Sequence, residues 1–269
     1  MAGTTLDAIA KGRDSRLKLL AVIPARYGSN RFPGKPLIAL AGRPMIQHVY
    51  ERVRQVQGVS RVLVATDDER ILRAVEDFGG EAILTRPDHR SGTERVAEVA
   101  AQVKAQVYVN VQGDEPLIEP ATIDLAVQAL SADTSVRVAT LCVAIANPSD
   151  IIDPNVVKVV FDFQGDALYF SRAPIPWVRS ESAGPVSFPV QHWKHIGLYV
   201  FRREVLLEFP TLPPGQLEKR ERLEQLRLLE NGYKIRVVES AYDSVSVDVP
   251  GDVARVEKLL RRVEAPKIE

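Results

Sequence analysis

The sequence predicts an α/β protein, and two observations support this prediction. In residues 19–111, short apolar runs that suit buried strands alternate with stretches of helical periodicity. This alternation is typical of parallel strands joined by crossover helices. In residues 136–238, strand-like segments follow one another through shorter turns, which indicates a β-rich insertion. We therefore expect a three-layer α/β/α, Rossmann-like fold with a mixed sheet.

The first half of the chain predicts both the strands and the helices between them. Segments with the apolar character of buried strands are the run that begins at Leu19 and residues 61–65, 81–84 and 107–111. Segments with helical signals are one opened by Arg43–Pro44, one capped by residues 66–68 and ended by Gly79–Gly80, and one from about Thr93. Polar loops follow the strands, where parallel sheets bind their ligands.

The second half is richer in strand signals. The expected strands are residues 136–144, 156–162, 167–171, 195–201 and 234–238, with a hairpin connection at 161–166. The expected helices are residues 217–230 and 250–263, and the stretch 171–190 is proline-rich and irregular. Because no long linker divides the chain, we expect residues 19–269 to form a single domain after a polar extension at residues 1–18. The β-rich insertion is the expected dimer surface.

Composition excludes several classes of protein. The 35 basic and 35 acidic residues balance, whereas proteins that coat nucleic acid carry a strong basic excess. Cys142 is the only cysteine, so an intrachain disulfide is excluded and its apolar surroundings predict a core position. No apolar run reaches the roughly 18 residues of a membrane span, and the polar N-terminus lacks a secretory h-region. We expect a cytoplasmic protein without nucleic-acid binding or membrane insertion.

Residues 19–37 join an apolar strand to a basic loop. Arg26, Arg31 and Lys35 place three cations in this loop, where they would neutralise a polyphosphate. Glycines let backbone N–H groups approach an anion closely, and prolines keep the loop in one shape. The alternative is a basic surface loop after a core strand.

The basic loop does not fit the two common phosphate-binding patterns. A Walker A loop has four residues between its glycines and a Ser or Thr after its lysine. Here five residues separate Gly28 from Gly34, and Pro36 follows Lys35. No G-x-G-x-x-G dinucleotide pattern occurs in the loop either. The loop therefore predicts a nucleoside triphosphate that is held for a purpose other than ATP hydrolysis or dinucleotide binding.

Two aspartates offer oxygen ligands for a metal. Asp114 follows the predicted strand 107–111, at the sheet edge where the basic loop also ends. Magnesium prefers one or two carboxylates together with phosphate oxygens and water, so Asp114 is a natural ligand. The alternating residues 244–248 bring Asp248 to a strand end just before the last helix. There Asp248 either joins Asp114 on the metal or caps that helix.

Further polar residues lie on a loop and on apolar elements. Ser91 or Thr93 can cap the helix that follows, and the N-terminal amides of that helix favour an acceptor-rich ligand; a plain helix cap is the alternative. An arginine fork such as that of Arg172 suits a carboxylate bidentately. Taken singly, however, Arg172 fits a structural arginine, His195 a satisfied strand histidine and residues 224–227 an exposed helix face.

Several of these stretches together resemble a known family. The run IPARYGSNRFPGKPL at residues 23–37 resembles the signature of the 3-deoxy-manno-octulosonate (Kdo) cytidylyltransferases. Six later stretches are similar and stand in the right order: PDHRSGTER (87–95), VQGDEP (111–116), YFSRAPIP (169–176), HIGLY (195–199), LEQLR (223–227) and VDVP (247–250). The resemblance runs from about Val22 to the last helix. Arg90 stands where glutamine is common and Val249 where threonine is usual, but Asp248 is kept.

The resemblance implies a role for each matching residue. It implies that magnesium is bound by Asp114 and Asp248, and that Arg26, Lys35 and Asp114 are the catalytic residues. The implied nucleotide-binding residues are Pro24, Ala25, Arg26, Arg31, Lys35, Arg90, Ser91, Gly92, Thr93 and Gln112. The implied sugar-binding residues are Gln112, Arg172, His195, Tyr199, Glu224 and Gln225. No residue is identified as a general base.

The resemblance also implies an activity. CTP and Kdo, a 2-keto-3-deoxy sugar acid, would give CMP-Kdo and pyrophosphate in lipopolysaccharide-type surface sugar synthesis, catalysed by a homodimer with Mg²⁺. Two alternatives stay open at this point. One is CMP activation of a related acid such as 8-amino-Kdo or a sialic acid, because discrimination at one carbon can rest on one side chain. The other is a non-catalytic nucleotide-binding regulator on the same fold.

Overall fold

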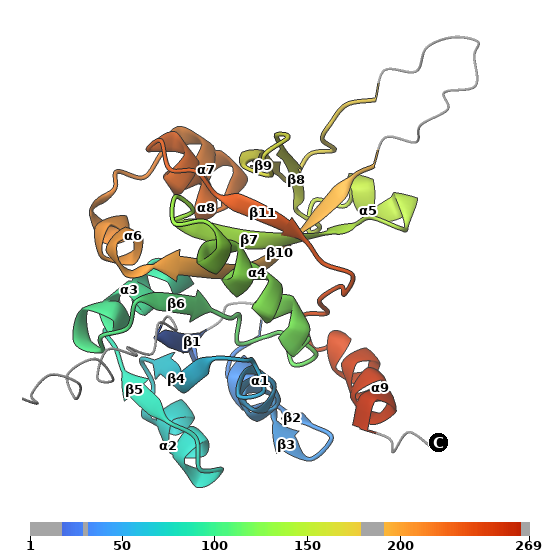
Figure 1. The fold of residues 1–269 in the computed structure, drawn as a ribbon. Coiled ribbons are helices and arrows are strands. Elements are labelled where there is room, and N and C mark those ends of the chain that lie inside the picture. Colours follow the sequence, from blue (N-terminus) through green and yellow to red (C-terminus); the bar gives the residue numbers. More distant parts are fainter. Residues whose placement is uncertain (1–17, 29–31, 179–190, 265–269) are drawn as a thin grey trace, which may run out of the picture.

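A mixed sheet forms the middle layer of the molecule (Figure 1). The computed structural model describes residues 18–28, 32–178 and 191–264. Within them, the nine-stranded sheet has the order β11-β7-β10-β6-β1-β4-β5, and the β8–β9 hairpin is attached to β10. The strands are β1 (Leu19–Ala25), β4 (Val59–Thr66), β5 (Ala82–Leu84), β6 (Val107–Asn110), β7 (Val138–Ala144), β8 (Lys158–Phe161), β9 (Ala167–Ser171), β10 (Trp193–Arg202) and β11 (Arg236–Glu239).

The direction of the strands changes at β10. Strands β6, β1, β4 and β5 are parallel neighbours, with Val22 of β1 opposite Asn110 of β6. Strand β10 runs antiparallel to both β6 and β7, and β11 is parallel to β7. The predicted mixed sheet is therefore confirmed. The carboxyl ends of β1 and β6 meet at one edge, which places the two loops that follow them side by side.

Helices cover both faces of the sheet. They are α1 (Met45–Val53), α2 (Glu69–Asp77), α3 (Gly92–Gln102), α4 (Pro120–Ala132), α5 (Pro148–Ile152), α6 (Arg203–Glu208), α7 (Gln216–Glu221), α8 (Gln225–Glu230) and α9 (Asp252–Glu264), with 3-10 turns η1 (Lys35–Leu37) and η2 (Phe209–Thr211). Apolar residues of α1, α2 and α4 pack on one face, whereas those of α3, α6 and α8 pack on the other. The three predicted layers are confirmed.

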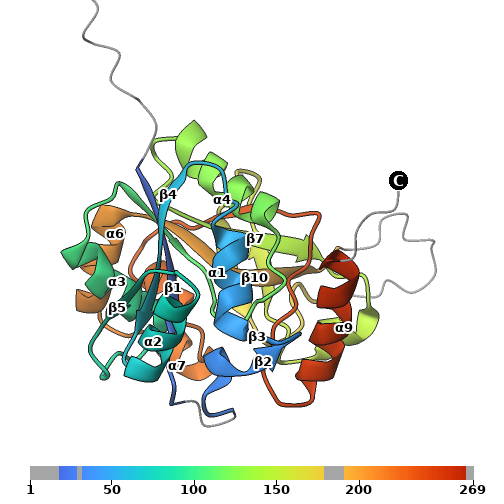
Figure 2. The ribbon, with the colours of Figure 1, turned by 90° about the horizontal axis from the view of Figure 1, so that it is seen from below.

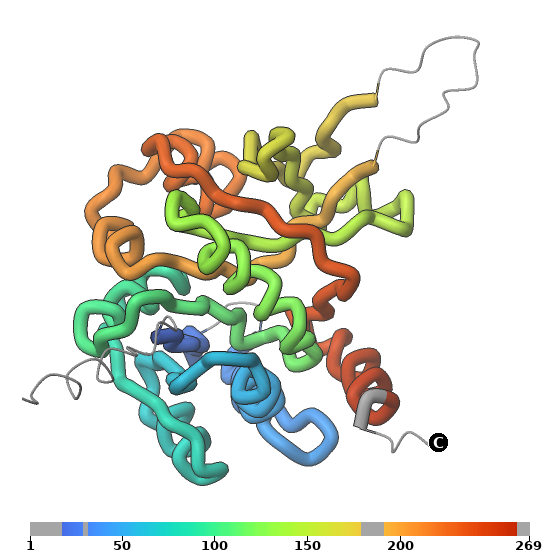
Figure 3. The backbone as a smooth tube through the Cα atoms, in the orientation of Figure 1, coloured from blue at the N-terminus to red at the C-terminus, as the bar shows by residue number. Residues whose placement is uncertain are grey.

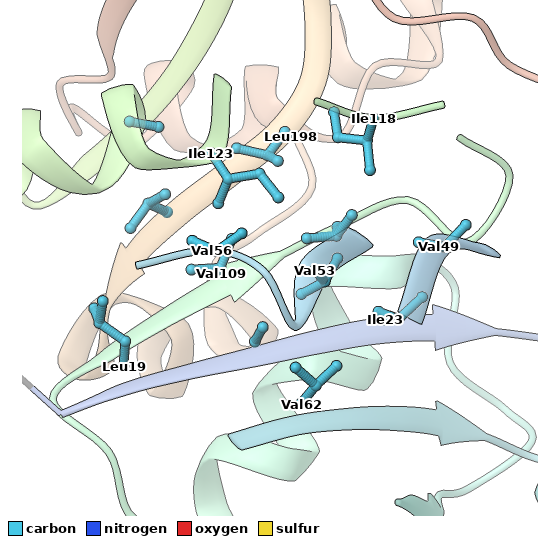
Figure 4. Packing of buried hydrophobic residues seen from close by; sticks show 14 of the residues in the cluster. Leu19, Ile23, Val49, Val53, Val56, Val62, Val109, Ile118, Ile123 and Leu198 are labelled. Carbon is cyan, nitrogen blue, oxygen red and sulfur yellow. The ribbon is translucent and has the colours of Figure 1, made fainter. Parts of the chain in front are cut away.

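Strand β1 shows why the sheet is buried on both sides. Successive side chains of a strand point to opposite faces. Leu19 and Ile23 lie in the first core cluster, which Figure 4 shows with Val53 of α1 and Ile123 of α4, whereas Val22 belongs to the second cluster. A continuous apolar run is the sequence that two covered faces require.

Several predicted boundaries or elements differ from the structure. Residues 244–248, which were expected to form a strand that ends at Asp248, form no strand, and helices α5 and α6 were not predicted. The helix expected at residues 217–230 is two helices, because Arg222 adopts a left-handed conformation (φ 54°) that ends α7 before α8 begins. Pro44 precedes α1 instead of occupying its first position, since its backbone is extended and pairs in the small β2 (Ala39–Leu40) and β3 (Arg43–Pro44) hairpin. Helix α4 was not predicted, although its buried positions, such as Ile123, follow a helical spacing.

The C-terminal helix returns to the N-terminal half of the chain. Val256 and Leu260 of α9 pack with Leu40 and Met45 in a third apolar cluster, which also contains Val247. Figures 2 and 3 show α9, in red, beside the β2–β3 hairpin. This packing brings the segment that carries Asp248 close to the basic loop. The β8–β9 hairpin forms as predicted, with Gly165 at φ 81° in its turn.

Some predictions fall outside the described residues. These include Arg31, all of the 1–18 extension except Lys18, and residues 179–190 of the proline-rich stretch. Cys142 is fully buried, as predicted, and burial raises the pKa of its thiol to about 12. Among the described helices, none combines the length and apolar character needed to cross a membrane.

Candidate active site

A cavity of about 480 Å³ opens where β1 and β6 end. It is lined by eight of the residues predicted for the nucleotide and by Asp114: Pro24, Ala25, Arg26, Lys35, Arg90, Ser91, Gly92, Gln112 and Asp114. The loops after two parallel strands and the start of α3 thus form one surface. Gly113 lets the two loops approach each other closely, because a Cβ there would lie only 3.1 Å from the carbonyl oxygen of Pro24.

A tight turn and an aromatic side chain fix the described part of the basic loop before Lys35. Gly34 has φ 69°, and its N–H donates to the carbonyl of Tyr27 at 2.9 Å. A Cβ on Gly34 would lie 3.2 Å from the Tyr27 ring, so glycine suits both the conformation and the space. The guanidinium of Arg70 lies 3.3 Å from the centroid of the Tyr27 ring, and Asp68 accepts hydrogen bonds from Arg70. Lys35 begins η1 directly after this turn.

Lys35 lies between the two predicted metal ligands. Its Nζ donates to Asp114 Oδ2 at 2.6 Å and lies 3.9 Å from Asp248 Oδ1. The backbone N–H of Val247 donates to the carbonyl of Asp114 at 2.9 Å, which ties the two segments together. Asp248 also accepts a hydrogen bond from Ser246 Oγ at 2.8 Å. The structure therefore brings Lys35, Asp114 and Asp248 into one cluster.

The paired carboxylates suit a hard divalent cation. The carboxylates of Asp114 and Asp248 both lie near the Lys35 ammonium group, so the space between them favours a cation. Across residues 18–28, 32–178 and 191–264, no cluster of three or more metal-binding side chains occurs. This donor set fits magnesium, which needs only one or two carboxylates when phosphate oxygens complete its shell. At the start of α9, the carboxylate of Asp252 accepts the N–H groups of Asp248 and Val249, which fixes the backbone that carries Asp248.

Glu115 differs from its neighbour Asp114. The side chain of Asp114 is 27% exposed, whereas Glu115 is buried. Burial and the nearby charge of Asp114 raise the pKa of Glu115 to about 7. Of the two adjacent carboxylates, Asp114 is thus the one that faces the cavity.

The loop at residues 85–92 is held by buried charges. The imidazole of His89 pairs with Glu98. Arg95 donates to Asp67 at 2.9 Å and also contacts Thr85. Both His89 and Arg95 line the cavity. Neither residue was predicted for the site, although both lie within the stretch at residues 86–95.

Ser91 caps α3, as the sequence allowed. Its Oγ accepts the N–H of Glu94 at 3.3 Å. Thr93 is buried and accepts a hydrogen bond from Asn110 Nδ2 at 3.3 Å. The two hydroxyls therefore have different positions: Ser91 lies at the cavity wall, whereas Thr93 links α3 to the end of β6.

Most of the residues predicted for the sugar gather beside the nucleotide cavity. Gln112, which lines the cavity, donates from Nε2 to the carbonyl of Gly197 in β10 at 3.0 Å. Register shifts between Ile196 and Tyr199 interrupt the pairing of β10 with β7 there. The rings of His195 and Tyr199 lie 5.5 Å apart, and His195 Nε2 contacts Thr140 Oγ1 at 3.0 Å. Burial lowers the pKa of His195 to about 3, so its ring is neutral at ordinary pH.

Several buried polar atoms in this region have no hydrogen-bond partner within the described residues. They are Asn110 Oδ1, Tyr199 Oη, Glu224 Oε2 and Gln225 Nε2. Leaving such atoms unpaired is costly in a folded protein, so an ordered water or a polar ligand that pairs with them would be stabilised. The start of α8 is also buried, with Gln225 at 5% and Arg227 at 4% exposure. The reading of residues 224–227 as an exposed face was therefore wrong.

Arg172 lies apart from this group. Its Nε donates to the carbonyl of Glu221 and its Nη1 to the carbonyl of Pro154, each at 2.8 Å. It is not among the residues that line the cavity. These contacts suit the structural alternative, and its predicted role in sugar binding stays a prediction.

The fold and the site together define a class of protein. A basic loop after β1, two converging aspartates and a polar cluster across the strand edge are the parts that a nucleotidyltransferase requires. Comparison with known proteins agrees with this class: residues 20–235 match the sequence model described as cytidylyltransferase.

Individual relatives narrow the class. A 3-deoxy-manno-octulosonate cytidylyltransferase of Solibacter usitatus is 53% identical over 244 residues, which is 91% of this chain and 95% of the relative. One of Geobacter metallireducens is 52% identical over 253 residues, covering 92% of this chain and 100% of the relative. This chain belongs to the 3-deoxy-manno-octulosonate cytidylyltransferase family.

Solved structures show the same fold. A CMP:2-keto-3-deoxy-manno-octonic acid synthetase in complex with CTP has a TM-score of 0.86 and 48% identity, covering 91% of this chain and 99% of that one. A 4-diphosphocytidyl-2C-methyl-D-erythritol synthase from Anaerococcus prevotii, 15% identical with a TM-score of 0.59, shares the fold alone.

Proposed function

We propose that this protein transfers CMP from CTP to Kdo, producing CMP-Kdo and pyrophosphate. The observation that carries the proposal is the meeting of the Lys35, Asp114 and Asp248 cluster with the partly unpaired polar cluster on β10 and α8. Membership of the family and the relatives' names support the same activity. Gln112 connects the two clusters through its hydrogen bond to Gly197.

The reaction would be an in-line displacement at phosphorus. The anomeric hydroxyl of the sugar attacks the α-phosphorus of CTP, and pyrophosphate leaves on the opposite side. Such chemistry depends mainly on positioning and on neutralising charge. In this proposal Arg26 and Lys35 hold the triphosphate and stabilise the leaving group. Arg31, which lies outside the described residues, would assist them.

Magnesium would be held by Asp114 and Asp248. When bound there, it would neutralise phosphate charge and lower the pKa of the attacking hydroxyl. The residues of the chain provide the rest of the site. Ser91, Gly92 and the neighbouring backbone at residues 90–92 would face the base and ribose, which suits the position of this turn at the cavity wall.

The sugar acid would lie against β10 and α8. Its hydroxyls and carboxylate are the polar groups that can pair with Tyr199 Oη and Gln225 Nε2, and with the neighbouring side chains of His195 and Glu224. Burial raises the pKa of Glu224. Its carboxyl oxygens are acceptors for the hydroxyl groups of the sugar.

The biological setting also forms part of the proposal. We expect a cytoplasmic homodimer that uses the β8–β9 insertion as its contact surface and supplies activated Kdo for lipopolysaccharide-type surface sugars. Gel filtration with light scattering tests the dimer. A monomeric protein with full activity would contradict that part alone.

Pyrophosphate release tests the activity and the choice of acid. The purified protein is incubated with CTP and Mg²⁺ and with Kdo, 8-amino-Kdo or a sialic acid in parallel. We expect the highest kcat/KM with Kdo. A preference for 8-amino-Kdo or a sialic acid would favour the related activity, and binding of CTP without turnover on any acid would favour a regulator.

A further inference from the structure

Arg227 of α8 connects three elements inside the protein. Its Nε and Nη2 donate to the two carboxylate oxygens of Glu218 on α7, at 2.9 and 2.6 Å. Its Nη1 donates to Glu94 Oε1 on α3 at 3.2 Å. The guanidinium also lies 4.7 Å from the ring centroid of Phe209. A planar fork held in this way fixes the geometry of its partners, which the single ammonium of a lysine does not.

Glu94 extends this connection to the nucleotide cavity. While Oε1 accepts from Arg227, Oε2 accepts the backbone N–H of Arg90 at 2.9 Å. The N–H of Glu94 in turn donates to Ser91 Oγ. This reciprocal arrangement is close to a capping box, which fixes the path of the chain into a helix. The turn at residues 90–92 lines the cavity, so the contact from Arg227 fixes a residue that shapes the nucleotide site.

The other end of the connection is the sugar cluster. Glu224 and Gln225 stand at the start of the helix that carries Arg227. The carboxyl of Glu224 is buried near Ser91 and Thr93 at the start of α3, and its Oε2 has no partner within the described residues. The separation of α8 from the start of α3 therefore determines both the turn at residues 90–92 and the position of these sugar-cluster groups.

We propose that Arg227 is a positioning residue that couples the two substrate sites, so that binding at one favours binding at the other. The inference rests on the proposed function, which supplies the identity of the two ligands. Arg227 acts through Glu94 on one side and through the start of α8 on the other. When one ligand orders contacts that the second also needs, the second binds with a smaller loss of entropy. Such coupling acts equally in both directions.

Calorimetry of ligand binding tests this coupling. The Kd of α,β-methylene-CTP, which cannot react, is measured with Mg²⁺ in the absence and in the presence of saturating Kdo. For the wild-type protein we expect Kdo to tighten binding by about fivefold or more. For Arg227→Gln the ratio should fall to about one, because the link to Glu94 and the fork to Glu218 are both lost.

Three further variants separate positioning from general stability. Glu94→Gln weakens the link to α3 and leaves the Arg227–Glu218 fork in place, and it should also lose the coupling. Arg220→Gln removes an exposed charge on α7 and should keep the wild-type ratio. Arg227→Lys keeps the charge without the fork and should recover only part of the coupling. In steady-state assays, loss of coupling should raise the KM of both substrates more than it lowers kcat.

The outcomes are distinct. Arg227→Gln with a native circular dichroism spectrum and an unchanged ratio would overturn the inference, as would a wild-type protein that binds both ligands without coupling. If Arg227→Gln does not fold, the ratio measured for Glu94→Gln decides the question in the same way. A wild-type protein that fails to bind Kdo would overturn the proposed function itself, and the inference with it.

Discussion

The nucleotide side and the sugar side of the site are built differently. On the nucleotide side, Lys35 and Asp114 stand on loops that follow parallel strands, and charged partners already satisfy them. On the sugar side, Tyr199 and Gln225 stand on an antiparallel strand and a short helix, and their polar atoms have no partner within the described residues. The nucleotide side therefore carries paired charges that suit a polyanion, whereas the sugar side carries unpaired polar groups that suit the hydroxyl groups of a sugar. Changes on the two sides should therefore affect different kinetic constants.

The largest effect is expected from Lys35→Ala. It removes the cation between Asp114 and Asp248, and with it a donor for the triphosphate. By analogy with the loss of one preorganised donor, kcat should fall by about 10²–10³-fold, or roughly 3–4 kcal/mol. Steady-state pyrophosphate release measures the change, with Lys219→Ala on exposed α7 as the matched control. A near-native kcat would remove Lys35 from the chemistry.

The second prediction concerns acid stability on the sugar side. Burial lowers the pKa of His195 from 6.5 to about 3, so the folded state holds the neutral ring. Between pH 6.5 and pH 3, His195 is protonated in the unfolded chain but neutral in the folded protein. The contribution of His195 to the free energy of unfolding is therefore complete above pH 6.5 and is lost as the pH falls toward 3. Between pH 7.5 and pH 5, the loss should be at most about 2 kcal/mol.

Urea unfolding of wild type and His195→Gln at both pH values isolates this effect. The pH dependence of the two proteins must be compared, because Glu115 affects stability in the opposite sense. With its raised pKa, Glu115 contributes to the free energy of unfolding below pH 4.5, and this contribution is lost as the pH rises through about 7. The free energy of unfolding of His195→Gln should decline less on acidification than that of wild type. Equal declines in the two proteins would contradict the assignment of His195.

A third prediction returns to the nucleotide side. Asp114→Asn removes one carboxylate from the pair while keeping its size, so the Mg²⁺ concentration for half-maximal activity should rise by about tenfold or more. Asp248→Asn should have a smaller effect, because that side chain is more exposed, at 43% against 27%. Magnesium titrations of pyrophosphate release provide the comparison. An unchanged titration for Asp114→Asn would show that Asp114 does not bind the metal.

The smallest effect is expected from Tyr199→Phe. The hydroxyl it removes has no partner within the described residues, so the folded protein should lose little stability. If that hydroxyl pairs with the sugar acid, its loss should raise the KM for Kdo by about fivefold, equivalent to about 1 kcal/mol. The KM for CTP should stay close to wild type. Equal changes in the KM for Kdo and the KM for CTP would contradict the proposed division into a nucleotide side and a sugar side.

The two sides also differ in how far the sequence predicted them. Lys35 and Asp114 were found because each follows a readable strand, and parallel strands end at the same edge. The reversal at β10 was not readable, since the direction of a strand depends on partners far along the chain. The break at Arg222 was also missed, because this exposed, non-glycine residue adopts a left-handed conformation within an otherwise helical pattern, and helix propensity does not predict it.

Buried ion pairs were the hardest features to predict. Arg227 and Glu94 are charged residues, and charged residues usually lie on exposed faces. Their burial depends on the ion pairs that Arg227 forms with Glu218 and with Glu94, which lies far away in the chain, and no local pattern contains that information. His89 was likewise overlooked, because its partner Glu98 lies on the next helix. The proposed chemistry was thus more predictable than the framework that positions it.

The identity of the product is the most direct test of the proposed transfer of CMP to Kdo. The protein is incubated with CTP, Kdo and Mg²⁺, and the nucleotide products are identified by mass spectrometry and ³¹P NMR. We expect CMP-Kdo and pyrophosphate in equal amounts, with the ester bond at the anomeric oxygen. Unchanged CTP in a protein that binds it, or a CMP ester formed only with a different acid, would contradict the proposed transfer.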